Sequence, residues 1–176
     1  MGGTEQEAAW VIQAQCGDRD AMEHVLRSVQ PPLRRYILRL VGPTAADDVL
    51  QDVLIAIARK LSWLDNPLLF RAWAYRIASR AAFAHVRRDR VRGREETSDE
   101  VLEALVAPVS RPSDEGLRAL LDGAELSPAS RAVLILHFQE DMPLAEVAAV
   151  LEIPLGTVKS RLAYGLTALR RHFADK

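Results

Sequence analysis

The sequence is nearly without cysteine, since Cys16 is the single one in 176 residues. One thiol cannot form an internal disulfide or a cysteine-rich zinc site, and a lone cysteine is more often a small buried residue than a redox switch. Long apolar runs are also missing, because no stretch approaches the roughly 20 residues that cross a membrane. The N-terminus has neither the basic nor the apolar region of a signal peptide. We therefore expect a cytoplasmic protein without direct membrane insertion.

Motifs of catalysis and metal binding are absent as well. The chain has no phosphate-binding glycine loop, no His-Glu-x-x-His and no Gly-x-Ser-x-Gly. Its four histidines are scattered and are expected at the surface or half-buried. Three nearby acids, Asp47, Asp48 and Asp52, fall on one predicted helix and do not converge on a cation as metal ligands must. We expect no enzyme activity, no catalytic residue, no cofactor and no metal site, and we interpret these acids as a protein-binding patch.

Helical periodicity dominates the chain, and no stretch alternates long enough to predict a strand, so the fold class is all-α. Two helices are predicted before Gly42, separated at Gly17-Asp18. Asp47 is predicted to be the N-cap of the next helix. One apolar stripe on that helix is predicted to be core, and it comprises Val49, Leu50, Val53, Leu54, Ile57 and Leu61. Asn66 and Pro67 then have the cap and first-turn chemistry of a long helix that ends near Arg92.

The net charge of −1 conceals an acidic middle segment. Residues 1–92 carry a net charge of +4, residues 93–126 carry −6 and residues 127–176 carry +1. Acids, serines and two prolines between 93 and 116 indicate a linker. The sequence therefore predicts two small helical domains, 1–92 and 117–176, joined by a flexible acidic linker at 93–116. In the second domain, Ser127-Pro128 should begin a helix that ends near Gln139.

The segment from Leu144 to Leu169 has the spacing of a helix-turn-helix. A first helix with Leu144, Val147, Ala148 and Leu151 on one face is followed by a turn at 152–154, and Pro154 can begin a helix but not continue one. The second helix is predicted to turn four apolar residues inward, Val158, Leu162, Leu166 and Leu169. It leaves five residues toward solvent: Thr157, Lys159, Ser160, Arg161 and Tyr164. Such side chains can contact phosphates and base edges in a major groove. The alternative is a helical hairpin with a polar outer face.

A second candidate for nucleic-acid binding is the stretch from Phe70 to Arg94. Eight arginines and a single acid, Asp89, lie between Arg71 and Arg94. Aromatic residues are interleaved with them: Phe70, Trp73, Tyr75 and Phe83. Arginines neutralise phosphates and aromatic rings stack on unpaired bases, which together suit partly opened DNA. The alternative is that the aromatic rings belong to the core and the arginines only solvate one face.

Taken together, these residues resemble the bacterial RNA polymerase sigma factors of the sigma-70 family, in particular the small extracytoplasmic-function (ECF, group 4) type with regions 2 and 4 only. Four stretches carry the resemblance: "AQCGDRDAM", "AADDVLQDVL", "FRAWAYRIA" and "LSPASRAVLILHFQEDMPLAEVAAVLEIPLGTVKSRL". The last is the most specific, since "GTVKSR" after a helix-turn-helix proline is a signature of the group. The match extends over nearly the whole chain.

The resemblance implies roles for individual residues. The core polymerase-binding surface, which docks on the clamp coiled coil of the β′ subunit, comprises Asp47, Asp48, Gln51 and Asp52. A loop at Ser62–Leu69 that holds a flipped base of the −10 element includes Trp63, Asp65 and Asn66. The helix that follows the non-template strand contributes Arg76, Arg80, Arg87 and Arg88. The helix that enters the major groove of the −35 element presents Thr157, Lys159, Ser160 and Arg161.

The implied function is promoter-specific transcription initiation with core RNA polymerase, whose β′ and β subunits are expected partners together with promoter DNA. The resemblance also implies an anti-sigma factor that holds the protein inactive. Two other functions remain open from the residues alone. A helix-turn-helix regulator that acts by itself has no need of the surface at Asp48, Gln51 and Asp52. A sigma mimic that titrates an anti-sigma factor has no need of Lys159, Arg161 or the arginines between Arg87 and Arg92.

Overall fold

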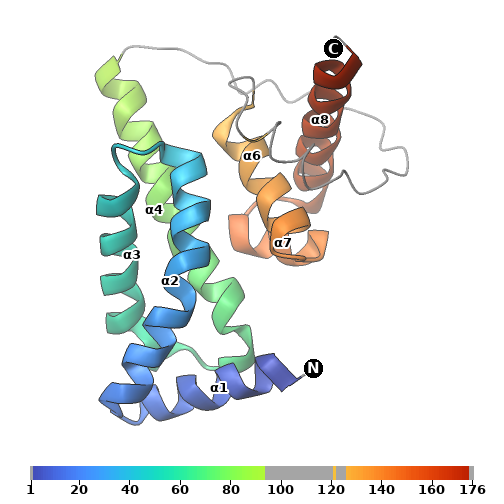
Figure 1. The fold of residues 1–176 in the computed structure, drawn as a ribbon. Helices are drawn as coiled ribbons and strands as arrows, with labels where there is room; N and C mark the ends of the chain where they lie inside the picture. Colours follow the sequence, from blue (N-terminus) through green and yellow to red (C-terminus); the bar gives the residue numbers. More distant parts are fainter. Residues whose placement is uncertain (1, 94–120, 122–125, 175–176) are drawn as a thin grey trace. The chain divides into compact units, whose positions relative to one another are not determined.

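The computed structural model describes residues 2–93, 121 and 126–174, and these residues form helices and no β-strand, which confirms the all-α fold class. The chain divides into two compact units, Met1–Val86 and Arg87–Lys176 (Figure 1). Almost all of the predicted acidic linker at 93–116 lies outside the described residues. Its extent therefore stays a prediction.

Unit 1 is built from four helices and two short 3-10 turns. In chain order they are α1 (Gly2–Gln15), α2 (Arg19–Val41), α3 (Ala46–Lys60), η1 (Leu61–Trp63), η2 (Pro67–Leu69) and α4 (Phe70–Gly93). The part of α4 from Arg87 onward belongs to unit 2. Helices α2 and α3 pack side by side, and α1 lies across one end of the three longer helices, against α2, η1 and η2 (Figure 1). Both 3-10 turns therefore pack against α1.

The apolar stripe predicted for the third helix forms part of the core. Five of its six members are buried, and Leu54 is half-buried. On the other side of the core, the Tyr36 hydroxyl lies 2.7 Å from Ser79 Oγ, and Ser79 Oγ donates to the Tyr75 carbonyl. Because a serine has one hydroxyl proton, Tyr36 must be the donor to Ser79. Burial raises the pKa of the Tyr36 phenol well above its ordinary value, so this link between α2 and α4 stays protonated.

The N-cap predicted for α3 is wrong. The helix begins one residue before Asp47, and the residue in the cap position, Ala45, has no capping side-chain hydrogen bond. The Asp47 carboxylate instead accepts from Arg34 of α2, with 2.8 Å between Nε and Oδ1. This hydrogen bond raises the pKa of Arg34 further above its usual range. The Asp47 carboxylate, which the sequence predicts as a helix cap, is therefore hydrogen-bonded to Arg34 of the neighbouring helix instead.

Helix α2 continues through Pro31 and Pro32, although proline removes a backbone donor and usually ends or bends a helix. The helix has buried residues on both sides of the pair, including Val29 before it and Leu33 after it. Their burial at a spacing of four residues keeps both halves against the same core. Tertiary packing therefore outweighs the cost of the two prolines.

From residue 126 onward, the described part of unit 2 contains α6 (Pro128–Leu134), a π-helical turn η3 (Ile135–Gln139), α7 (Leu144–Leu151) and α8 (Leu155–Ala174). Ser127 caps α6 by accepting from the backbone N–H of Ser130, and Pro128 occupies the first turn, as predicted. Helix α8 packs against α6 and α7. Of the inward residues predicted on α8, Val158, Leu162 and Leu166 are buried, and the side chain of Leu169 lies outside the described part.

Candidate nucleic-acid interface

The helix-turn-helix predicted in the C-terminal part is present. Helix α7 ends at Leu151, and its C-cap residue, Glu152, adopts a left-handed conformation with φ of 56°. The backbone N–H of Ile153 donates to Ala148, and that of Val158 donates to Pro154, so the two helices are closed on both sides of the turn. Val147, Val150 and Val158 are buried. The buried residues of α7 are thus Val147 and Val150. The other three residues predicted on the inner face, Leu144, Ala148 and Leu151, are only half-buried.

The outer face of α8 presents the four residues predicted to contact the −35 element. Lys159 is exposed, and Thr157, Ser160 and Arg161 are half-buried. The Ser160 hydroxyl donates to the carbonyl of Thr157 at 3.0 Å, so its oxygen remains available only as an acceptor. Two further exposed side chains flank this face, Leu155 and Tyr164, of which Leu155 was not singled out by its sequence.

Helix α4 displays the predicted basic surface in part. Arg80, Arg87 and Arg88 are exposed, and Arg76 is half-buried. Two of the interleaved aromatic rings, Phe70 and Tyr75, are fully buried, whereas Trp73 and Phe83 are half-buried. Stacking on unpaired bases is therefore excluded for the two buried rings, which belong to the core.

The loop Ser62–Leu69, which includes the end of η1 and all of η2, carries a largely exposed aromatic side chain. Trp63 is 74% exposed, and it lies between Leu61 and Leu64, whose side chains are buried. Asp65 and Asn66 are exposed, and Asn66 accepts from the backbone N–H of Leu68, as predicted for a cap. The exposed apolar side chains of Leu68 and Leu69 continue this surface. These two leucines belong to the loop that the resemblance assigns to the flipped base, but neither was among the individual residues predicted to contact it.

A compact acidic surface lies on α3. Asp48, Gln51 and Asp52 are exposed, and none of them has a side-chain hydrogen bond or ion pair within the described residues. Asp47 is exposed beside them but is paired with Arg34. Exposed Ile55 adds an apolar contact point at the same helix. We refer to Asp47, Asp48, Gln51 and Asp52 as the α3 acidic surface.

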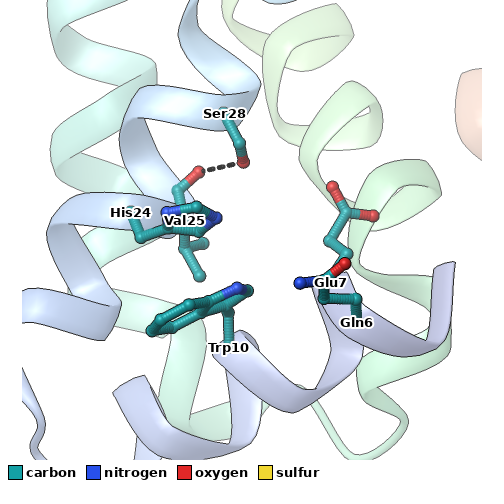
Figure 2. A pocket seen from close by; sticks show the side chains of 6 residues that line it. All are labelled: Gln6, Glu7, Trp10, His24, Val25 and Ser28. Carbon is teal, nitrogen blue, oxygen red and sulfur yellow. Dashed lines mark hydrogen bonds between the residues drawn. The ribbon is translucent and has the colours of Figure 1, made fainter. Parts of the chain in front are cut away.

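A cavity of about 320 Å³ lies between α1 and α2. It is lined by Gln6, Glu7, Trp10, His24, Val25 and Ser28. The rings of Trp10 and His24 stack with centroids 4.3 Å apart, while Glu7 points into the cavity from α1 (Figure 2). Partial burial raises the pKa of the Glu7 carboxyl, and the positive charge of Arg71 opposes that change. The Ser28 hydroxyl donates to the Val25 carbonyl and is not poised as a nucleophile.

The described residues include histidines, acids and a cysteine, the side chains that most often ligate metals. In the part of the chain that the structure describes, no three His, Cys, Asp or Glu residues are grouped to hold a metal ion. His24 is exposed and His85 and His137 are half-buried, as predicted. Cys16, however, is exposed rather than buried, because it follows the last residue of α1 at the surface. Across the described helices, none combines the length and apolarity that crossing a bilayer requires.

These features define a two-unit helical protein whose second unit contains a helix-turn-helix. Residues 25–92 match the family model of sigma-70 region 2, and residues 124–171 match that of sigma-70 region 4. The chain is 33% identical over 147 residues to the ECF RNA polymerase sigma factor SigL of Mycobacterium tuberculosis, covering 78% of this chain and 80% of SigL. It is 26% identical over 180 residues to the ECF sigma factor SigW of Bacillus subtilis, covering 94% of this chain and 95% of SigW.

Solved structures show the same fold. The sigma factor RpoE of Bartonella quintana, in complex with the anti-sigma factor NepR, gives a TM-score of 0.66 at 20% identity, over 86% of this chain and 96% of RpoE. CnrH, in complex with the cytosolic domain of CnrY, gives a TM-score of 0.66 at 21% identity, over 97% of this chain and 98% of CnrH. The chain belongs to the ECF sigma factors of the sigma-70 family. It is a transcription initiation factor that acts with core RNA polymerase at promoter DNA.

Proposed function

We propose that α8 enters the major groove of a −35 promoter element and contacts it through Thr157, Lys159, Ser160 and Arg161. Lys159 is exposed and carries the charge that a phosphate requires. The Ser160 proton is committed to the Thr157 carbonyl, so Ser160 is suited to accept from an exocyclic amino group of adenine or cytosine. Arg161 supplies the geometry for a guanine edge or a phosphate.

The loop with Trp63, Asp65 and Asn66 holds an unpaired base of the −10 element, and Arg76, Arg80, Arg87 and Arg88 of α4 follow the same strand. The support is the exposure of the Trp63 ring, which gives an unpaired base a stacking surface. The Asn66 oxygen is occupied by the N–H of Leu68, so its amide N–H groups are the part that can contact DNA. The arginines neutralise the phosphates of the strand once it is separated.

The α3 acidic surface binds the β′ clamp coiled coil of core polymerase. The observation that carries this proposal is that Asp48, Gln51 and Asp52 are exposed together and have no partner within the described residues. A regulator that works alone has no use for such a surface. A cationic polymerase surface would satisfy all three side chains.

The domain roles follow from these surfaces. Residues 1–92 bind polymerase and the −10 element, residues 93–116 connect the domains, and residues 117–176 bind the −35 element. An anti-sigma factor holds the protein inactive, which is supported by the likeness of its fold to RpoE, a sigma factor solved in complex with one. We place the protein in the cytoplasm, where RNA polymerase acts, and assign no reaction to the chain itself.

The test is run-off transcription with purified core polymerase and a promoter library randomised at the −35 and −10 positions. We expect transcripts from a subset that shares two spaced elements, only when both the chain and core are present. Site-specific DNA binding without core, and no core-dependent transcript, would favour a regulator that works alone. Binding of an anti-sigma factor with neither DNA binding nor a transcript would favour a sigma mimic.

A further inference from the structure

The segment "AQCGDRDAM" near the N-terminus forms a rigid junction between α1 and α2. The backbone N–H of Asp18 donates to Gln13 and that of Gly17 donates to Ala14, which is the Schellman pattern that ends a helix. Gly17 has φ of 93°, a conformation that glycine adopts without strain. The Asp18 carboxylate then caps α2 by accepting from Asp20 and Ala21. Both helix ends at this junction are therefore fixed.

Gln15 lies in the last turn of α1, and its side chain reaches across to the loop that carries Trp63. Its amide Nε2 donates to the Leu61 carbonyl at 2.9 Å and to the Leu64 carbonyl at 2.8 Å. A side-chain amide has two N–H groups, so both are used, one at each end of η1. The loop contributes one hydrogen bond of its own at this point, from the Leu64 N–H to the Leu61 carbonyl.

The two hydrogen bonds hold the turn while its exposed residues project. The side chains of Leu61 and Leu64 are buried at 1% and 9% exposure, whereas Trp63 between them is 74% exposed. Packing of the leucines sets the depth of the turn, but not the rotation of its carbonyls. The Gln15 amide restricts that rotation, because one planar group donates to both carbonyls.

We propose that Gln15 is a positioning residue for promoter recognition, which orients Trp63 for the unpaired base of the −10 element. This inference rests on the function proposed above for the Trp63 loop. Without the amide, the two part-buried carbonyls must turn toward water, and the loop samples orientations in which Trp63 faces away from the DNA. Apparent affinity falls in proportion to the fraction of protein that keeps the competent orientation.

The test uses Gln15→Met, which keeps the length of the side chain and removes both donors. The matched control is Gln13→Met, an exposed position on the same helix. Holoenzyme is reconstituted with each variant. The probe is a fluorescent single-stranded oligonucleotide with the non-template −10 sequence obtained from the library selection. We expect about tenfold weaker binding for Gln15→Met and less than twofold change for Gln13→Met, with unchanged co-purification with core polymerase.

Trp63→Ala separates this inference from the function on which it rests. If Trp63→Ala binds the oligonucleotide like wild type, the proposed role of the loop is wrong, whatever Gln15 does. If Trp63→Ala weakens binding and Gln15→Met does not, the inference is overturned. We expect Gln15→Met to add little in the Trp63→Ala background, since there is no ring left to position. An equal loss in both backgrounds would mean that Gln15 acts only through general stability, and would reject the inference.

Hydrogen exchange gives a second readout that does not depend on DNA. Binding is compared at a temperature where circular dichroism shows both proteins folded, and exchange is followed in the free protein under the same conditions. Gln15→Met should speed exchange in peptides covering residues 61–66 and leave α8 unchanged. Unaltered exchange at residues 61–66 would show that the amide does not hold the turn.

Discussion

Gly165 of α8 packs closely against Leu134 of α6, and its replacement by alanine tests the packing of the DNA-binding unit. A Cβ built at Gly165 would lie 2.7 Å from Leu134 Cδ1, 3.2 Å from Cγ and 3.3 Å from Cδ2. Leu134 is fully buried in α6, so its side chain cannot swing into solvent to make room. The side chain, the helix axis or both must shift.

The size of the effect follows from two opposed terms. Inserting a methyl group into a packed core costs about 1–3 kcal/mol. Replacing glycine by alanine inside a helix recovers about 0.5–1 kcal/mol. We therefore expect Gly165→Ala to destabilise unit 2 by about 1 kcal/mol. Gly156 is the matched control, since it lies on the same helix with nothing within 4 Å of the added Cβ. Gly156→Ala should stabilise the free protein by about 0.5 kcal/mol.

Urea unfolding of the full chain measures both variants and supplies its own internal reference. The three tryptophans, Trp10, Trp63 and Trp73, all lie in unit 1, so their fluorescence reports that unit alone. Far-UV circular dichroism reports both units. Gly165→Ala should lower the dichroism transition of unit 2 and leave the fluorescence transition unchanged. If Gly165→Ala stabilised the protein as much as Gly156→Ala, the close approach of α8 to Leu134 would be refuted.

Three further variants test the proposed surfaces and the Glu7 carboxyl. Asp48→Arg should weaken binding to core polymerase about tenfold or more with the fold intact. The control Glu5→Arg reverses a charge at an exposed site on α1 and should not weaken binding. Pull-down with core polymerase measures both variants. If Arg161 contacts a base edge, Arg161→Ala should reduce discrimination at one −35 position by about 1–3 kcal/mol of binding free energy. If Arg161 contacts phosphate, the variant should bind all promoters more weakly and with a smaller salt dependence. Equilibrium binding to promoter variants distinguishes the two outcomes. Burial raises the pKa of Glu7 above 4.5, so the protonated carboxyl stabilises the folded state below that pH. This stabilisation is lost as the pH rises through the pKa of Glu7 in the folded state. Glu7→Gln should therefore stabilise the protein at pH 7 by less than about 1 kcal/mol and have no such gain in acid, as pH-dependent thermal melting would show.

Features that depend on residues close together in the chain were predictable from sequence. Asn66 and Pro67 begin the turn before α4, and Ser127 and Pro128 begin α6, because a cap and a first-turn proline need only neighbours within three residues. The helix-turn-helix was equally accessible, since Pro154 cannot continue α7 and the buried Val158 fixes the face of α8.

Features that depend on distant partners were not predictable. Asp47 has the chemistry of a cap, and only the folded arrangement places Arg34 beside it. Tyr75 looks like a stacking residue among arginines until α2 brings Tyr36 against it, with ring centroids 5.3 Å apart. Gln15 is an ordinary glutamine in the sequence, because its partners lie 46 and 49 residues away. The sequence thus shows what each side chain can bind, but tertiary packing determines which residue it contacts.

Helix energetics do not account for all the charge of the α3 acidic surface. The dipole of α3 favours Asp47 and Asp48 in its first turn, and Arg34 neutralises Asp47, but neither effect extends to Asp52. Asp48 and Asp52 are four residues apart on one helix, a spacing at which like charges destabilise by a few tenths of a kcal/mol. Folding alone would therefore favour a neutral residue at position 52. In the proposed complex with core polymerase, a cationic partner surface would remove this repulsion, so the same pair that weakens the isolated helix would strengthen the complex.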